Sequence, residues 1–121
     1  MPDGTQVVLR YRDGRTERAT LLGTDSEREV FTVAHDGGAS NDVPFASLKA
    51  VFFPRQSPED PVEEADGSTI SVEFADGEVI RGLAHYNPER NGFFLFPVDR
   101  SKNDRIFVVN SAISSIEVEK L

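Results

Sequence analysis

The chain contains an internal repeat, and this repeat limits its possible folds more than any other feature of the sequence. Residues 7–14 (VVLRYRDG) resemble residues 70–77 (ISVEFADG), so that two Asp-Gly pairs lie 63 residues apart. The same offset aligns Phe31 with Phe94. Later in the copies the offset becomes 65, and it aligns Leu48 with Ile113, Val51 with Ile116 and Phe53 with Val118. Two copies of a unit of about 50 residues therefore account for the chain. They form a tandem pair and not a solenoid, which needs at least about three repeats.

The second copy has the pattern of a series of short β-strands. Ile70, Val72 and Phe74 alternate with other residues and are followed by Asp76-Gly77, which is typical of a strand that enters a tight hairpin turn. Glycine suits this turn because it accepts a positive φ angle without a steric penalty. Four further strands are predicted after the turn, at about residues 79–86, 93–98, 105–109 and 115–119.

A tight turn at residues 110–113 separates the last two of these strands, and the first copy shows the same plan over residues 29–34 and 43–53. Five short strands with such a turn before the last one are typical of small SH3-like and Sm-like barrels. We therefore predict an all-β fold, a tandem repeat of two small five-stranded SH3-like or Sm-like barrels.

The distribution of charge divides the chain into two domains and a linker. Residues 58–66 hold five acidic residues, two prolines and no basic residue, so an extended, solvated segment is expected there. The predicted domains are residues 1–57, the first β-barrel repeat, and residues 67–121, the second.

Composition excludes several classes of protein. The chain has 21 acidic and 13 basic residues, a net charge of −8, which repels the phosphates of nucleic acids. It has no cysteine, so it forms no disulfide, and it fits a reducing compartment. The start of the sequence (MPDG) lacks the pattern of a signal peptide, and no apolar run approaches the ~18 residues of a membrane span. We expect a cytoplasmic protein without a membrane partner.

The second copy also resembles a known family. The residues that carry the resemblance are 74–82 (FADGEVIRG), 86–88 (YNP), 92–99 (GFFLFPVD) and 103–113 (NDRIFVVNSAI). They are similar to an uncharacterised bacterial family of small β-barrel domains, SH3-like or Sm-like, which occur alone or beside signalling modules of the PilZ and response-regulator kind. The resemblance spans most of residues 70–121, and the first copy matches more loosely. It implies a barrel fold and a role near signalling proteins, and it implies no particular activity.

The sequence shows no arrangement of residues that is typical of an active site. Its two histidines, His35 and His85, do not align with each other in the two copies, and there is neither a Gly-x-Ser-x-Gly motif nor a cysteine nucleophile. Residues 99–104 lack the alternating acids and closing Glu of a helix-flanked calcium loop, and Arg100 and Lys102 would repel a cation. We therefore expect no enzyme activity, no catalytic residue, no metal and no cofactor.

Strands that are apolar on both faces point to contact with a partner. Phe52-Phe53 and residues 93–96 (FFLF) provide more apolar surface than one barrel of about 50 residues can bury, so part of it faces the other copy or another chain. Phe94 is expected to be a core residue. The candidate interaction surface combines aromatic with basic residues: Phe52, Phe53, Arg81, Tyr86, Phe93, Arg90, Arg100, Lys102 and Arg105.

These observations favour a non-catalytic protein–protein interaction module, an adaptor, in bacterial signalling or regulation. Its partner is expected to be another protein, and self-association is a further option. One alternative is an Sm-like RNA-binding protein, which the net charge and the acids interleaved among the basic residues disfavour. A second alternative is a small-ligand sensor with its pocket between the two barrels.

Overall fold

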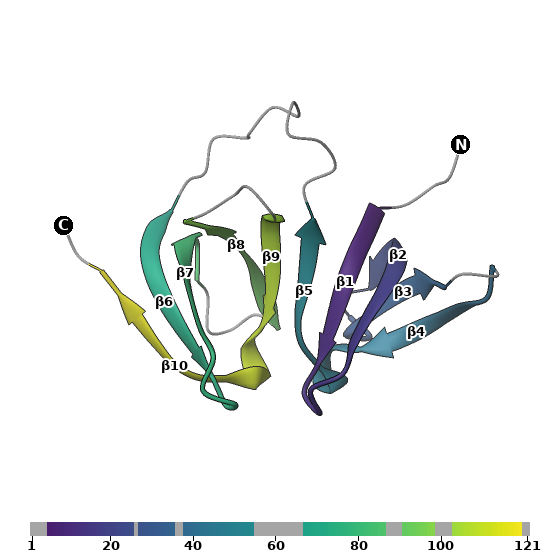
Figure 1. Ribbon diagram of the computed structural model, residues 1–121, viewed down its shortest axis with the longest axis horizontal. Helices are drawn as coiled ribbons and strands as arrows, with labels where there is room; N and C mark the ends of the chain where they lie inside the picture. Colours follow the sequence, from purple (N-terminus) through teal and green to yellow (C-terminus); the bar gives the residue numbers. More distant parts are fainter. Residues whose placement is uncertain are drawn as a thin grey trace.

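The computed structural model describes residues 5–25, 27–35, 38–54, 67–86, 91–98 and 103–119. These residues are all-β, as predicted, with ten strands and two short 3-10 turns, η1 and η2 (Figure 1). The elements in chain order are β1 (Thr5–Tyr11), β2 (Thr16–Asp25), β3 (Val30–Ala34), β4 (Ser40–Pro44), η1 (Phe45–Ser47), β5 (Leu48–Pro54), β6 (Ser68–Phe74), β7 (Val79–Ala84), β8 (Gly92–Pro97), β9 (Asn103–Val109), η2 (Asn110–Ala112) and β10 (Ile113–Val118).

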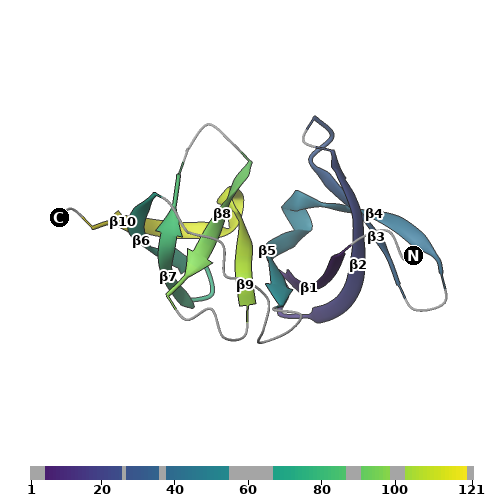
Figure 2. The same cartoon turned by 90° about the horizontal axis from the view of Figure 1, so that it is seen from above.

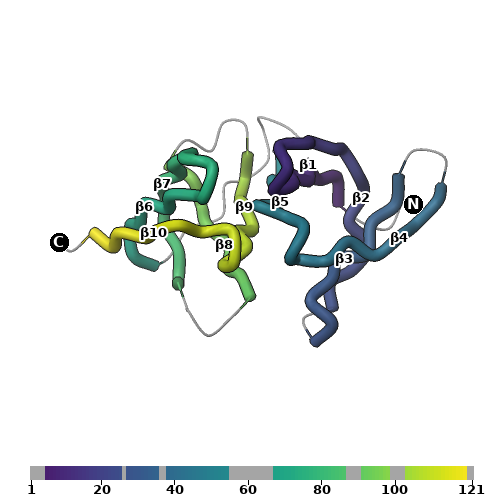
Figure 3. The backbone as a smooth tube through the Cα atoms, turned by 90° about the horizontal axis from the view of Figure 1, so that it is seen from below, coloured from purple at the N-terminus to yellow at the C-terminus, as the bar shows by residue number. Residues whose placement is uncertain are grey.

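All ten strands belong to one antiparallel sheet, in the order β10-β6-β7-β8-β9-β5-β1-β2-β3-β4. Each half of the sheet contains five strands, and in each half the last strand pairs with the first, β5 with β1 and β10 with β6. The halves are joined by the pairing of β5 with β9, in which Ala50 lies opposite Val108 and Phe53 opposite Arg105. Figures 2 and 3 show these two strands side by side between the halves. We call this pairing the inner joint.

Local sequence determines the turns of both halves. The Asp-Gly turns join β1 to β2 and β6 to β7, and their glycines have positive φ angles, 94° at Gly14 and 92° at Gly77, which confirms the predicted hairpins. In each turn the Asp side chain accepts a hydrogen bond from the backbone N–H two residues later, from Arg15 to Asp13 and from Glu78 to Asp76. The 3-10 turns η1 and η2 precede the last strand of each half, and η2 lies where the sequence predicted a tight turn.

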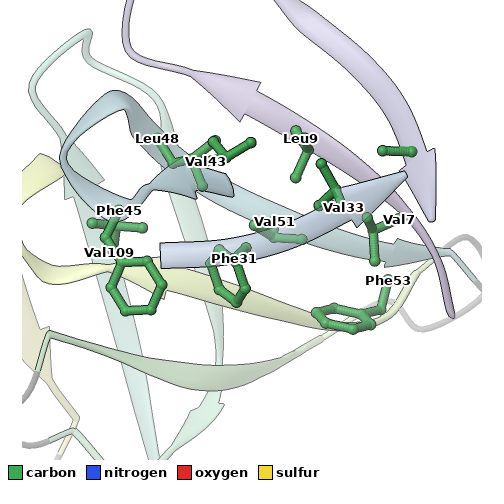
Figure 4. Close-up of a cluster of buried hydrophobic side chains, with 11 residues drawn as sticks. Val7, Leu9, Phe31, Val33, Val43, Phe45, Leu48, Val51, Phe53 and Val109 are labelled. Carbon is green, nitrogen blue, oxygen red and sulfur yellow. The ribbon is translucent and has the colours of Figure 1, made fainter. Parts of the chain in front are cut away.

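The two strands of the inner joint serve two hydrophobic cores, one on each side. Alternate residues of β5 and β9 enter the core of the first half, shown in part in Figure 4: Val51, Phe53, Phe107 and Val109. The residues between them enter the core of the second half: Ala50, Phe52, Ile106 and Val108. Since every residue of a strand points to one face or the other, both faces of these strands are apolar. Two neighbouring positions of β5, Phe52 and Phe53, are therefore both apolar because each faces a different core.

The inner joint also keeps each half from closing. Among the described strands no pairing closes either half into a barrel, in contrast to the predicted pair of closed barrels. To close the first half, β4 would have to pair with β5, but the edge of β5 that it needs is occupied by β9. To close the second half, β10 would have to pair with β9, but the edge of β9 that it needs is occupied by β5. Each half is an open, curved sheet (Figure 2). The predicted linker, residues 58–66, lies outside the described residues.

Candidate functional site

Five phenylalanine rings form a continuous cluster that crosses the inner joint. Phe31 of β3 and Phe45 of η1 form a tilted pair with their ring centroids 4.6 Å apart, and both contact the ring of Phe107 on β9, at 5.2 and 5.6 Å. Phe107 meets the ring of Phe94 on β8 at 5.3 Å, and Phe94 meets Phe53 of β5 at 5.7 Å. These are the separations of favourable edge-to-face and tilted aromatic pairs. Figure 4 shows three of these rings, Phe31, Phe45 and Phe53.

The outer end of the cluster reaches the surface at Phe94, whose side chain is 43% exposed. The guanidinium of Arg105 lies over two of the rings, with its Cζ 4.7 Å from the centroid of Phe53 and 5.3 Å from that of Phe94. Both distances fall within the range of cation–π contacts. A weak ion pair, 3.5 Å from Arg105 Nη1 to Asp104 Oδ2, also holds the guanidinium. We call Phe94 and Arg105, supported by Phe53 beneath them, the aromatic face.

The aromatic face offers two kinds of contact to a partner. The exposed part of the Phe94 ring can pack against an apolar side chain, and the rest of the cluster fixes the position of the ring in advance. The side chain of Arg105 is about one third exposed, and its guanidinium has further N–H donors for a carboxylate. An apolar side chain followed by an acidic one therefore matches this face best.

Phe94 was expected in the core and Phe93 on the interaction surface, and the structure reverses both. Phe93 is 6% exposed and belongs to the core of the second half, whereas Phe94 points outward. All four residues of the run FFLF are apolar, so the sequence pattern does not show which of them face the core. The packing of β8 decides which side chains face the core: Phe93 and Leu95 enter the core of the second half, so Phe94 between them lies on the other face of the strand.

The remaining predicted site residues are spread over the molecule. Phe53 is only 4% exposed, so it supports the aromatic face from below and is not itself an accessible contact. Phe52 lies on the opposite side of β5, partly covered by the guanidinium of Arg10, 5.1 Å from its ring centroid. Tyr86 is exposed and packs its ring on Phe93 at 5.3 Å. Among the described members of the predicted set, only Phe53 and Arg105 meet at the aromatic face.

Arg81 takes part in a local ion pair. Its Nη2 donates to both carboxylate oxygens of Glu119, at 2.6 and 2.7 Å, and this hydrogen bond raises the pKa of the guanidinium. Three other predicted basic residues lie outside the described residues: Arg90, Arg100 and Lys102. Sequence reasoning missed Phe107 as a site residue, and its only sequence signal is its place in the doubly apolar segment 106–109 (IFVV).

A group of charged residues connects the two halves below the inner joint. Lys49 of β5 is 7% exposed, and its Nζ donates to the carboxylates of Asp76, at 2.7 Å, and Glu78. Arg10 of β1 donates through Nη1 to both oxygens of Glu78, each at 3.2 Å. Arg12 bonds to the hydroxyl of Ser111 on η2. Basic residues of the first half thus hold the β6–β7 turn and η2 of the second.

Two small hollows lie along this boundary between the halves, and they share Ser111. The first, about 80 Å³, is lined by residues around Lys49: Arg12, Lys49, Ala75, Asp76, Ser111 and Ala112. The second, about 180 Å³, is lined by Glu29, Phe45, Ala46, Asn91, Val109, Asn110 and Ser111. Drug-sized ligands occupy cavities of roughly 300–1,000 Å³. Both hollows are thus smaller than the pocket of a typical ligand sensor.

The described residues contain no group of three or more His, Asp or Glu side chains that could hold a metal ion. No helix in that part of the chain has the length and apolar character needed to cross a membrane.

Fold and site together define the class of the molecule: an all-β protein with two five-stranded halves, one shared sheet and an aromatic face at its inner joint. The chain belongs to a family of unknown function, DUF6982, whose model matches residues 3–120. Comparison with curated proteins and with solved structures finds no match.

Proposed function

We propose that this protein is a non-catalytic interaction module in bacterial signalling or regulation, and that the aromatic face binds a segment of a partner protein. The two halves are, in this proposal, copies of one SH3-like or Sm-like unit that have opened to share the inner joint. Their matching strand order and matching 3-10 turns support common origin. The resemblance to domains found beside PilZ and response-regulator modules supports the signalling context.

The observation that carries the proposal is the 43% exposure of Phe94 at the end of a fixed cluster of rings. Aromatic residues and arginine are enriched among the residues that dominate binding energy in protein interfaces. A ring already held by its neighbours loses little conformational freedom on binding, so more of the contact energy appears as affinity. Phe94 and Arg105 therefore form a preorganised anchor point.

The charge of the site and of the chain favours a protein over RNA as the partner. A base could stack on Phe94, but a binding groove for single strands also needs a positive surface along the backbone. The described part of the chain places Asp104 against Arg105, and the whole chain carries a net charge of −8. A peptide contributes an apolar side chain and a carboxylate without a line of phosphates, so it matches the site better.

The experiment is affinity capture from the native lysate with the tagged protein, with and without nuclease, using the wild type and Phe94→Ser. We expect a protein that co-purifies with the wild type in stoichiometric amount, survives nuclease and is lost with Phe94→Ser. Val79→Ser is the matched control, since Val79 is also an exposed apolar strand residue and lies outside the aromatic face. Capture that disappears with nuclease would instead support RNA binding, and capture indifferent to Phe94 would refute the proposed site.

A further inference from the structure

The pairing of β5 with β9 at the inner joint shows what kind of strand a free edge of this sheet can bind. There, β5 presents its edge to β9, and each residue pair lies over one of the two cores: Val51 with Phe107 over the first, Phe52 with Ile106 over the second. Cross-strand neighbours share a face of the sheet. Each side chain of a strand that pairs with this edge must therefore suit the side chain opposite it.

The repeat gives β5 and β9 counterparts at the two outer edges of the sheet, β10 and β4, each of which pairs with one described strand only. The offset of 65 residues places Val51 on Ile116 and Phe52 on Glu117. It also places Val108 on Val43, and each of these two valines is buried in the core of its own half. The outer edges are thus equivalent in position to the strands of the inner joint.

A second copy of the chain does not fit these edges in the arrangement of the inner joint. If β4 of one copy paired with β10 of another in the register of the inner joint, Asp42 would take the place of Phe107 and lie beside Ile116, against a core. Glu117 would take the place of Phe52 and face the core of the other copy. Both carboxylates are exposed, and burying either one without a partner is strongly unfavourable.

The edge of β10 nevertheless has a defined chemistry of its own. Ile116 packs partly against the core of the second half, Val118 is exposed beside it, and Glu117 lies on the opposite face. Arg81 lies on the same side, but its guanidinium is bonded to Glu119, so among the described residues Glu117 has no ion-pair partner. The edge therefore alternates apolar and acidic positions.

We propose that β10 accepts an extended segment of a partner protein in which apolar residues alternate with a basic one. The segment adds a strand through backbone hydrogen bonds. Its apolar residues lie opposite Ile116 and Val118, and a Lys or Arg lies opposite Glu117. This surface is separate from the aromatic face and does not depend on it.

The probe is a labelled heptapeptide with the sequence of residues 103–109, the natural partner of β5, carrying Arg105→Val and Ile106→Lys. In the register of the inner joint the valine then falls opposite Val118 and the lysine opposite Glu117. Its binding to the wild-type chain is followed by fluorescence anisotropy, and the affected backbone amides are located by NMR. We expect saturable binding with shifts concentrated in β10. Glu117→Lys should weaken this binding about fivefold, the size expected when an opposite-charge cross-strand pair becomes a like-charge pair.

A charge swap makes the test specific. The heptapeptide with Arg105→Val and Ile106→Glu should bind the wild type weakly and regain affinity for the Glu117→Lys chain. Phe94→Ser should leave peptide binding unchanged, which separates this proposal from the aromatic face. The proposal is overturned if the peptide does not bind, if binding ignores the charge at position 117, or if ultracentrifugation shows wild-type oligomers that Glu117→Lys dissociates, because a second copy would then be the occupant.

Discussion

Lys49 Nζ of the first half lies 2.7 Å from Asp76 Oδ2 of the second, so that an ion pair spans the boundary between the halves. Lys49 also donates to Glu78, and its ammonium lies 4.8 Å from the ring centroid of Phe74. The lysine is buried, whereas the two acids reach solvent. A buried cation whose partners all come from the other half fixes how the halves are oriented, because any rotation would leave the ammonium without counter-charges.

The first prediction concerns the asymmetry of this contact. Lys49→Met removes the buried charge and keeps most of the side-chain volume, so the free energy of unfolding should change by less than about 1 kcal/mol. The double variant Asp76→Asn, Glu78→Gln leaves the ammonium buried without a counter-charge and should destabilise the protein clearly more. Chemical denaturation of both variants measures the difference.

Asp13→Asn provides the control, because Asp13 occupies the equivalent Asp-Gly turn of the first half and, within the described part of the chain, its ion pair is with Arg15 at the surface. Its substitution should have a smaller effect than the double variant. If Lys49→Met proves the most destabilising of the three, the ion pair contributes net stability and its main role is not orientation.

The second prediction concerns acid. The hydrogen bond from Lys49, and after it the one from the Glu78 N–H, lowers the pKa of the Asp76 carboxyl below its ordinary value of 3.8. A carboxyl with a lowered pKa in the folded state stabilises the protein above its ordinary pKa, and this contribution is lost as the pH falls through the lowered value. Between pH 5 and pH 2, about the range in which such carboxyls titrate, Asp76→Asn should therefore lose less stability than the wild type.

Denaturation curves at a series of pH values test this expectation, and the Lys49→Met background supplies the control. Since Lys49 is the largest cause of the lowered pKa, the effect of Asp76→Asn on the pH dependence of stability should shrink when Lys49 is absent. An equal effect in both backgrounds would assign the lowered pKa to the turn backbone and not to the lysine.

Local features of the fold could be predicted from the sequence, because they depend on neighbouring residues. The Asp-Gly hairpins, the all-β class and the turn before the last strand all follow from short patterns. The face of the strand FFLF could not be predicted, because four apolar residues in a row carry no alternation. Its orientation depends on the packing of β8 within its own half and on contacts with Phe53 and Phe107.

The third prediction tests that orientation with two adjacent residues. Phe93→Ala removes a ring that is 6% exposed and should cost about 3–5 kcal/mol of the free energy of unfolding. Phe94→Ala removes a ring that is 43% exposed, and its cost should be about 1 kcal/mol, since much of the ring already contacts water. Urea denaturation of the two variants gives the comparison directly. Equal losses, or a larger loss at Phe94, would contradict the assigned faces of β8.

The contacts between the halves could not be predicted either, for a different physical reason. Phe52 and Phe53 showed that β5 has apolar neighbours on both faces, but the backbone donors and acceptors along its edge are those of any strand, and apolar side chains do not distinguish β9 from another apolar strand. The sequence is equally compatible with closure of each half on itself. Only the inner joint places Lys49 beside Asp76 and Arg105 over Phe53.

The last prediction tests the inner joint through a glycine beside it. Gly92 begins β8, and a Cβ atom added there would lie 2.5 Å from both Phe107 Cζ and the carbonyl oxygen of Val108. Gly92→Ala should therefore displace the Phe107 ring or the β9 backbone and destabilise the protein by about 1–3 kcal/mol, the usual cost of overpacking.

Gly23→Ala is its matched control, because Gly23 also lies in a strand and a Cβ atom there would meet nothing within 4 Å. Its effect should stay within about 0.5 kcal/mol. Because Phe107 carries the contact from the core of the first half to Phe94, Gly92→Ala should also weaken partner capture in proportion to the displacement of the ring. Normal stability and normal capture in Gly92→Ala would mean that β8 and β9 are packed less tightly than the structure shows.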